Sequence, residues 1–106
     1  QRSADIFLGL PYDIAMYGLL LEMLAKGAKL KAGQLIGNLG DCHLYNNHID
    51  QAELQLSRAM KKLPFLLLNK GITLEDNKII IPKHEDVDID NYSPHPNIKA
   101  ELSVGT

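Results

Sequence analysis

The stretch from Asp13 to Lys26 limits most strongly what this chain can fold into, because it predicts a helix with apolar side chains on nearly every face. At helical spacing one face carries Ile14, Tyr17, Leu20, Leu21 and Leu24, and the other side carries Met16, Leu19 and Met23. A helix of this composition is expected to be buried nearly all round. Its most apolar part is shorter than the roughly 20 residues that a membrane span needs. The stretch therefore predicts an interior helix of a folded domain, with no association with a membrane.

The rest of the chain predicts short strands and one further helix. We expect strands at residues 4–8, 34–44 (bent or bulged around two glycines), 64–68 and 78–81, a weak acidic strand at 87–89, and an irregular tail from residue 92. Asn46 or Asn47 is a suitable cap for a second helix that reaches about Arg58. Strands mixed with two helices predict the α+β class.

The composition excludes several classes of protein. The 106 residues fit one domain or a piece of one, and 45% apolar residues are too many for a disordered chain. A formal net charge of −2 gives no basic face for a nucleic-acid polymer. The single cysteine excludes an internal disulfide framework and favours a reducing, cytoplasmic location. Because Gln1-Arg2-Ser3 runs directly into the strand expected at residues 4–8, with no leader, cap or initiating methionine, we expect the chain to be a piece of a longer polypeptide.

Three segments carry the functional information. They are QRSADIFLGLPYDIA at residues 1–15, GDCHLYNNH at residues 40–48, and YSPHP at residues 92–96. In order and spacing they resemble the C-terminal part of thymidylate synthases and of the related deoxycytidylate hydroxymethylases. The resemblance spans nearly the whole chain and is weakest from residue 70 to residue 90.

The resemblance implies a fold and a place within it. Residues 1–106 would form the C-terminal portion of a single catalytic domain, with a bent mixed sheet and a long buried helix. The family's nucleophilic cysteine stands in a Pro-Cys-His context that is absent here, so it would precede Gln1. Cys42 lies where relatives carry varied small residues, and we interpret it as a small buried filler. No catalytic residue is therefore expected within the chain, and the chain alone is expected to be inactive.

Arg2 and Ser3 are the predicted phosphate site. An arginine fork beside a hydroxyl suits a phosphate dianion, to which it donates charge-assisted hydrogen bonds. The resemblance assigns this pair to the 5′-phosphate of the nucleotide. The alternative from the residues alone is an ordinary pair on the surface.

His43 and Tyr45 are two residues apart, so on a strand they share a face. Each can reach a sugar hydroxyl, and the resemblance assigns the pair to the 3′-hydroxyl of the deoxyribose. The alternative is a half-buried pair with satisfied polar tips. We interpret His48 as structural. No cysteine or carboxylate cluster at ligand spacing accompanies the histidines, so no metal site is expected.

Asp5 and Gly9 are assigned to the folate by the resemblance. The aspartate matching Asp5 binds the pterin ring, and the backbone at Gly9 passes close to the ligands. From the residues alone, Asp5 would be a solvated strand residue and Gly9 a turn glycine.

Asp13 departs from the pattern of thymidylate synthases, which carry asparagine there to read uracil. Cytosine presents the reverse hydrogen-bonding edge, with N3 as acceptor and N4 as donor. An ionised carboxylate accepts from N4–H, and a protonated one donates to N3 and accepts from N4. Both states favour cytosine, and deoxycytidylate hydroxymethylases carry aspartate here. The alternative is that Asp13 caps a helix beginning at Ile14.

The sequence thus predicts part of an enzyme that transfers a one-carbon unit from 5,10-methylenetetrahydrofolate to C5 of a pyrimidine deoxynucleotide monophosphate. We expect dCMP to be favoured, with a hydroxymethylated or methylated product. The alternatives are a thymidylate synthase that acts on dUMP, or a nucleotide-binding domain without activity. The resemblance also implies a homodimer formed by back-to-back sheets, to which residues 4–8 and 34–44 would contribute.

Overall fold

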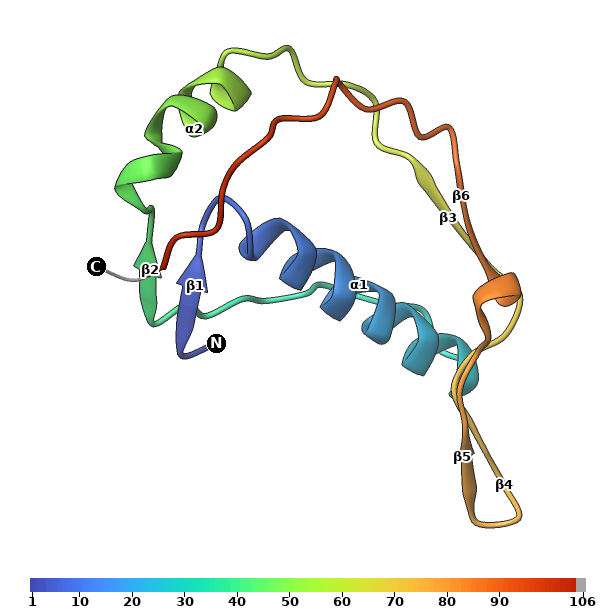
Figure 1. The fold of residues 1–106 in the computed structure, drawn as a ribbon. Helices are drawn as coiled ribbons and strands as arrows, with labels where there is room; N and C mark the ends of the chain where they lie inside the picture. Colours follow the sequence, from blue (N-terminus) through green and yellow to red (C-terminus); the bar gives the residue numbers. More distant parts are fainter. Residues whose placement is uncertain (105–106) are drawn as a thin grey trace. The chain divides into compact units, whose positions relative to one another are not determined.

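The computed structural model describes residues 1–104, and it confirms the α+β class (Figure 1). Its helices and strands are β1 (Ser3–Asp5), α1 (Leu10–Gly27), β2 (Asp41–His43), α2 (Ile49–Leu56), β3 (Phe65–Leu68), β4 (Thr73–Glu75), β5 (Lys78–Ile80) and β6 (Val87–Asp90), with 3₁₀ turns at Asn46–His48 and His84–Asp86. The strands pair two by two, as β1–β2, β3–β6 and β4–β5. No helix within residues 1–104 combines the length and apolarity needed to cross a membrane.

The chain divides into two compact units. The first unit contains Gln1–Ala15, Ile36–Lys61 and the chain from Pro94 onward, and the second contains Met16–Leu35 and Lys62–Ser93. Every residue predicted to bind a ligand belongs to the first unit.

The first unit is organised by the parallel pair β1–β2. Ser3 lies opposite Asp41, Ala4 opposite Cys42, and Asp5 opposite His43. Gly40 directly precedes β2, and an added Cβ there would lie 2.6 Å from the carbonyl oxygen of Arg2. A side chain at position 40 would therefore push the two strands apart.

Strand β1 is shorter than predicted, because the chain turns directly after Asp5. The Asp5 carboxylate accepts a hydrogen bond from the backbone N–H of Phe7, with 3.2 Å between Oδ1 and N. Short aspartate side chains commonly close turns in this way. Strand β2 is also shorter than the predicted strand 34–44. Pairing with β1 covers only Asp41–His43, and residues 30–39 have no regular structure.

Helix α1 begins three residues earlier than predicted, at Leu10 rather than Asp13. Pro11 sits in its first turn, where the missing N–H costs no helical hydrogen bond. The backbone N–H of Asp13 donates to the carbonyl of Gly9 at 3.0 Å, so Asp13 already lies inside the helix. The interpretation of Asp13 as a helix cap is therefore wrong.

The second predicted helix is present but begins differently. A 3₁₀ turn at Asn46–His48 leads into α2, and neither start has a side-chain cap. Asn47 instead donates from Nδ2 to the carbonyl of Glu101, at 3.3 Å. The predicted asparagine cap is therefore wrong, because the asparagine side chain binds the C-terminal segment.

The second unit contains two antiparallel pairs. Strand β3 pairs with β6, with Leu66 opposite Ile89. The hairpin β4–β5 turns through Asp76 and Asn77, whose φ angles of 50° and 60° are those of a two-residue type I′ turn. The C-terminal end of α1 approaches the loop before β4, and the N–H of Ile72 donates to the carbonyl of Met23 at 2.9 Å.

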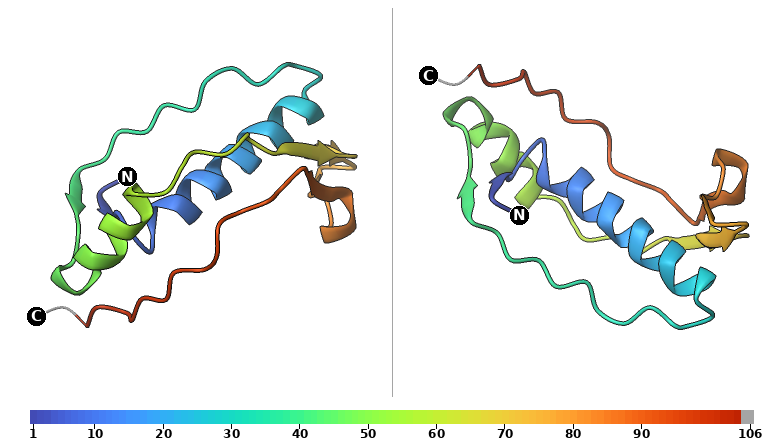
Figure 2. Two further views of the ribbon diagram at one scale, coloured as in Figure 1. Left: turned by 90° about the horizontal axis from the view of Figure 1, so that it is seen from above. Right: turned by 90° about the horizontal axis from the view of Figure 1, so that it is seen from below.

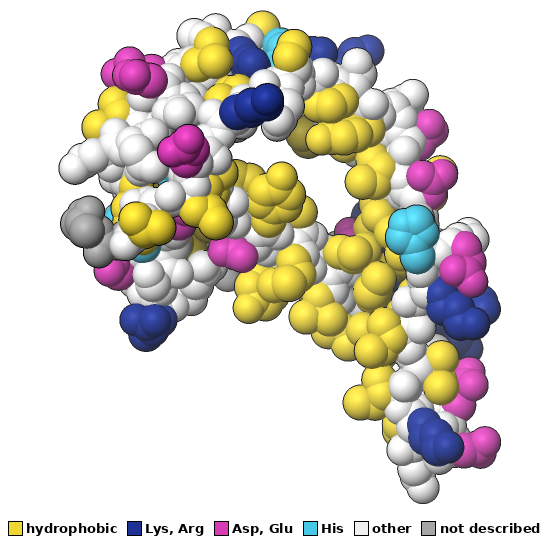
Figure 3. Space-filling view, viewed as in Figure 1, with side chains coloured by type: hydrophobic (Ala, Val, Ile, Leu, Met, Phe, Trp, Pro, Cys, Tyr) yellow, Lys and Arg dark blue, Asp and Glu magenta, His cyan; other side chains and the backbone are white. Residues whose placement is uncertain are grey.

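The predicted burial of α1 is wrong for this chain. No residue of the helix is buried, and Figure 3 shows apolar side chains at the surface along it. Strand β3 is likewise not buried, with Phe65 63% exposed. The physical reason is that residues 1–104 supply no layer that packs over these elements. Within that range, only Ala4 and His48 are fully buried.

Candidate functional site

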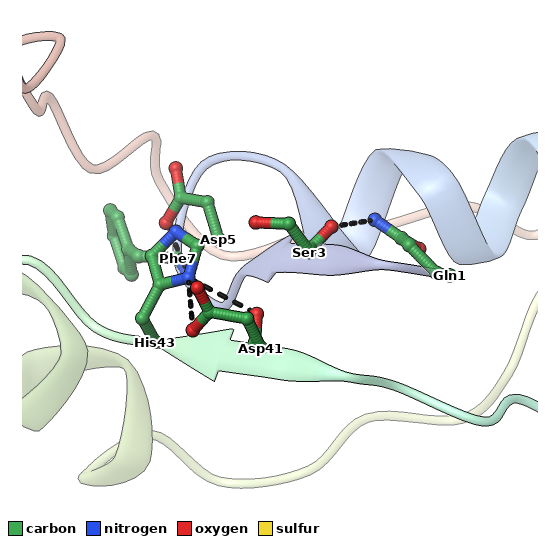
Figure 4. Close-up of polar contacts among 6 residues, drawn as sticks. All are labelled: Gln1, Ser3, Asp5, Phe7, Asp41 and His43. Atoms are coloured by element: carbon green, nitrogen blue, oxygen red, sulfur yellow. Dashed lines mark hydrogen bonds and ion pairs between the residues drawn. The ribbon is translucent and has the colours of Figure 1, made fainter.

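One face of the β1–β2 pair gathers four polar side chains. Opposite residues of neighbouring strands point to the same side, and so do residues two apart along a strand. Ser3 and Asp5 of β1 therefore share a face with Asp41 and His43 of β2, as Figure 4 shows. The register thus places Ser3, Asp5 and His43 on one strand face. These residues are predicted to bind the phosphate, the folate and the sugar, respectively.

The imidazole of His43 contacts Asp41, on the same strand, and Tyr45, which follows the strand. Its Nδ1 lies 3.2 Å from the backbone carbonyl oxygen of Asp41 and 3.4 Å from the Asp41 carboxylate (Figure 4). Tyr45 packs edge-on against it, with 5.0 Å between ring centroids. The structure therefore brings His43 and Tyr45 together, as their spacing predicted.

The ring of His48 packs against Tyr45 of this pair. It is fully buried, and its ring lies 6.0 Å from that of Tyr45 and 5.6 Å from that of Phe7. Its Nε2 donates to the carbonyl of Glu101 at 2.6 Å, which ties the C-terminal segment to the start of α2. Figure 2 shows that segment running past α2. These contacts agree with the interpretation of His48 as structural.

The C-terminal segment is held at a second point. Arg58 donates to the carbonyl of Pro96 at 2.7 Å, and His95 Nε2 donates to the carbonyl of Ala59 at 2.8 Å. An open groove lies beside this segment, lined by Leu8, Tyr12, Asn47, Gln51 and residues 97–101.

Asp5 and Gly9 lie at the two ends of the turn that follows β1. Asp5 is half-buried, and within residues 1–104 only its Oδ1 accepts a hydrogen bond, from the N–H of Phe7. A Cβ at Gly9 would lie 3.3 Å from the carbonyl oxygen of Asp5 and 3.8 Å from Oδ2 of Asp13. Gly9 thus fills a tight place between the backbone carbonyl of Asp5 and the carboxylate of Asp13.

Asp13 is half-buried in the first turn of α1, and its carboxylate has a partner just before β1. The Gln1 side-chain amide donates from Nε2 to Asp13 Oδ2 at 2.9 Å and to the carbonyl of Ser3 at 2.8 Å. The remaining oxygen, Oδ1, accepts no hydrogen bond from residues 1–104. The N-terminal turn of a helix is a favourable place for a negative charge.

Arg2 stands apart from the other predicted residues. Its side chain is exposed and makes no hydrogen bond or ion pair with the described part of the chain. Its backbone carbonyl accepts from the N–H of Asp41 at 2.8 Å, which fixes the chain at this point. The backbone is therefore positioned by strand pairing while the guanidinium stays free of protein partners.

Cys42 is exposed, so the prediction of a buried filler is wrong. The side chain belongs to β2, and residues 1–104 place no element over it. On a strand it points away from the face that carries Asp41 and His43.

Three residues that shape the site were not predicted from the sequence: Gln1, Gly40 and Asp41. Asp41 stands two residues before His43, and this spacing is the signal that could have linked them. The contact of Gln1 with Asp13 joins residues twelve apart, and no local pattern indicates it.

The fold and the site together define an α+β protein with a polar strand face that carries carboxylate, imidazole, phenol and hydroxyl groups. The sequence model of the thymidylate synthase family, described as thymidylate synthase, matches residues 1–104. The chain therefore belongs to the thymidylate synthase family, whose enzymes transfer a one-carbon unit from a folate to a pyrimidine nucleotide.

Proposed function

We propose that this chain is the nucleotide- and folate-binding portion of an enzyme that modifies C5 of dCMP, as a deoxycytidylate hydroxymethylase or methylase. The observation that carries the proposal is Asp13, at the position where thymidylate synthases read uracil with asparagine. Helix α1 starts at Leu10, so helix capping gives no reason for a carboxylate at position 13. Its free Oδ1 is an acceptor suited to the N4 amino group of cytosine and unsuited to O4 of uracil.

The nucleotide would be held at its other end by Arg2, Ser3, His43 and Tyr45. Arg2 carries an exposed guanidinium that has no polar partner among residues 1–104, which suits a phosphate. His43 ends β2 on the face shared with Ser3, and the ring of Tyr45, two residues further along the chain, packs against it. A monophosphate with a 3′-hydroxyl offers the two groups that this set can bind.

The folate would be held by Asp5 beside Gly9. Asp5 is half-buried and keeps Oδ2 free of hydrogen bonds within residues 1–104, so it can accept from N–H groups of a pterin ring. Gly9, at the other end of the same turn, has no side chain that would crowd the backbone of Asp5. These residues fit 5,10-methylenetetrahydrofolate, which supplies the one-carbon unit when it is bound.

The nucleophile that adds to C6 of the pyrimidine would come from outside these 106 residues. Cys42 is exposed and belongs to the strand face opposite that of His43, so it is poorly placed to reach a base held by Asp13. The chain would therefore act as the C-terminal portion of the catalytic domain, which binds and orients the two substrates.

Release of tritium from [5-³H]dCMP tests this proposal, because substitution at C5 must expel the hydrogen there. The 106-residue chain alone should release none with methylenetetrahydrofolate. The same chain joined to the preceding part of its polypeptide should release tritium from dCMP faster than from [5-³H]dUMP. Faster release from dUMP would support thymidylate synthase activity instead, and release by the 106 residues alone would return Cys42 to consideration as the nucleophile.

A further inference from the structure

Strand β3 has one hydrogen-bonded neighbour within residues 1–104 and one open edge. It pairs with β6 alone, in antiparallel register (Figure 1). Opposite residues of such a pair alternate between those that exchange backbone hydrogen bonds and those that do not. The N–H of Asn69 donates to the carbonyl of Asp86 at 2.9 Å, so every second pair from there exchanges bonds. The N–H and C=O groups of Leu66 and Leu68 therefore point away from β6, and they make no backbone hydrogen bond in the described part of the chain.

An open groove runs along this edge of β3. Leu66 and Leu68 line its strand side, and no residue of β6 lines it. The opposite side is formed by Lys26, Leu30 and Lys31, from the end of α1 and the segment that follows. All of these residues belong to the second unit. The unpaired backbone groups of β3 thus lie beside a groove that has both apolar and charged walls.

The wall opposite β3 is basic at two positions. Lys26 and Lys31 are exposed, and neither makes a hydrogen bond or an ion pair within residues 1–104. Among the described residues that line the groove, Glu22 is the one carboxylate, and it has no ionic partner in that range either. Two ammonium groups against one carboxylate give the wall a net positive charge. The groove therefore favours an acidic occupant.

Strand β6 shows which sequence pattern β3 accepts as a neighbour. Its residues alternate, with the apolar Val87 and Ile89 on one face and the acidic Asp88 and Asp90 on the other. A second extended segment with this alternation would bind the open backbone groups of β3 through its main chain. Its acidic side chains would then reach toward the lysines of the opposite wall, and its apolar ones would cover the leucines.

We propose that the open edge of β3 is a docking site for an acidic, extended segment of another protein, which adds a strand to the β3–β6 pair. Strand addition of this kind takes its affinity from main-chain hydrogen bonds and its specificity from the side-chain contacts. A second copy of β3 is a poorer occupant, because antiparallel pairing centred on Leu66 would place Lys62 opposite Lys70 of the other copy. The site lies in the second unit, so its occupant is separate from the nucleotide and the folate proposed above.

Hydrogen exchange resolved to single amides tests the docking, with a synthetic peptide that copies residues 85–91 as the probe. The protein is the whole polypeptide that contains these 106 residues. Saturating peptide should slow exchange of the Leu66 and Leu68 amides by about tenfold or more, because both become hydrogen-bonded. The amide of Asp88, in a pair that already exchanges bonds, should change little. A peptide in which lysine replaces each acidic residue should give no protection.

Charge reversal tests the part played by the lysines. Lys26→Glu and Lys31→Glu should each weaken binding of the labelled peptide, measured by fluorescence anisotropy, by about three- to tenfold. The effect should shrink at high salt, because both side chains are exposed. Lys78→Glu, in the β4–β5 hairpin, is the matched control and should leave binding unchanged.

Several results would overturn the inference. Protection of Leu66 and Leu68 before any peptide is added would mean that the rest of the polypeptide covers the edge, or that a second copy does if protection rises with protein concentration. Faster exchange at Asp88 would mean that the peptide displaces β6 instead of adding to β3. No protection at saturating peptide, or binding that is unchanged in both lysine variants, would contradict docking of an acidic strand.

Discussion

The side-chain amide of Gln1 donates a hydrogen bond to the Asp13 carboxylate, with 2.9 Å between Nε2 and Oδ2. The same amide nitrogen lies 2.8 Å from the carbonyl oxygen of Ser3. Because one carboxylate oxygen of Asp13 is occupied in this way, the other is the one available to a base. The partner of Asp13 thus determines which oxygen would read cytosine.

Replacing Gln1 should weaken base selection without abolishing nucleotide binding. Gln1→Ala removes the hydrogen bond that orients Asp13, and losing one hydrogen bond to a charged group costs about 1.5–3 kcal/mol at most. We expect the preference for dCMP over dUMP to fall by about tenfold. Competition binding measures this, and Gln55→Ala, an exposed glutamine of α2, is the matched control. An unchanged preference would show that Asp13 is oriented by other groups.

Replacing Arg2 should weaken recognition of the phosphate group and leave binding of the rest of the nucleotide nearly unchanged. Its exposed side chain makes no polar contact within residues 1–104, so Arg2→Ala should leave the free energy of unfolding nearly unchanged. Binding of dCMP should weaken by about 1.5–3 kcal/mol, while binding of deoxycytidine, which lacks the phosphate, should change little. Calorimetric titration with both ligands measures the difference. Equal losses would mean that Arg2 does not receive the phosphate.

Gly40 tests whether the β1–β2 pair assembles the site. A Cβ at position 40 would lie 2.6 Å from the carbonyl oxygen of Arg2, which cannot move without breaking the strand pairing. Gly40→Ala should destabilise the protein by about 1–3 kcal/mol and weaken nucleotide binding. Gly37→Ala is the control, since a Cβ there meets nothing within 4 Å. Denaturant unfolding compares them, and equal stabilities would contradict the close approach.

The proposed homodimer gives a further prediction. Ile36 is 76% exposed and lies in the segment that we propose to contribute to the dimer. Ile36→Asp should place a charge in that contact and shift the protein toward monomer, whereas Leu74→Asp in the β4–β5 hairpin should not. Sedimentation equilibrium measures the dissociation constant of the dimer for each. A wild-type monomer at micromolar concentration would count against the proposal.

The sequence predicted the type and place of most elements, because local patterns decide them. The apolar period of α1 and the alternation of His43 and Tyr45 are signals of this kind. The strand at 78–81 was predicted and is present as β5, but its hairpin partner β4 was missed because Asp76-Asn77 was not recognised as a two-residue turn. Helix α1 begins three residues before the predicted start, because Pro11 is tolerated in the first turn of a helix.

Burial and long-range contacts could not be predicted in the same way. An apolar helix indicates that a covering layer is needed but does not show whether the chain supplies one, and α1 is left without buried residues. The contact of Gln1 with Asp13 and that of His48 with the carbonyl of Glu101 join residues 12 and 53 positions apart. Such contacts depend on the folded arrangement rather than on any local pattern.

The measurement that tests the central claim most directly is competition between dCMP and dUMP for the protein, in wild type and in Asp13→Asn. The wild type should prefer dCMP. Asparagine offers one acceptor and one donor in place of two acceptors, so Asp13→Asn should shift the preference toward dUMP. A site built on hydrogen bonds rejects a mispaired ligand by up to roughly 10⁴-fold, and a single change should give much less, on the order of 10–100-fold. A wild type that prefers dUMP, or a preference that does not move in Asp13→Asn, would contradict cytosine recognition by Asp13.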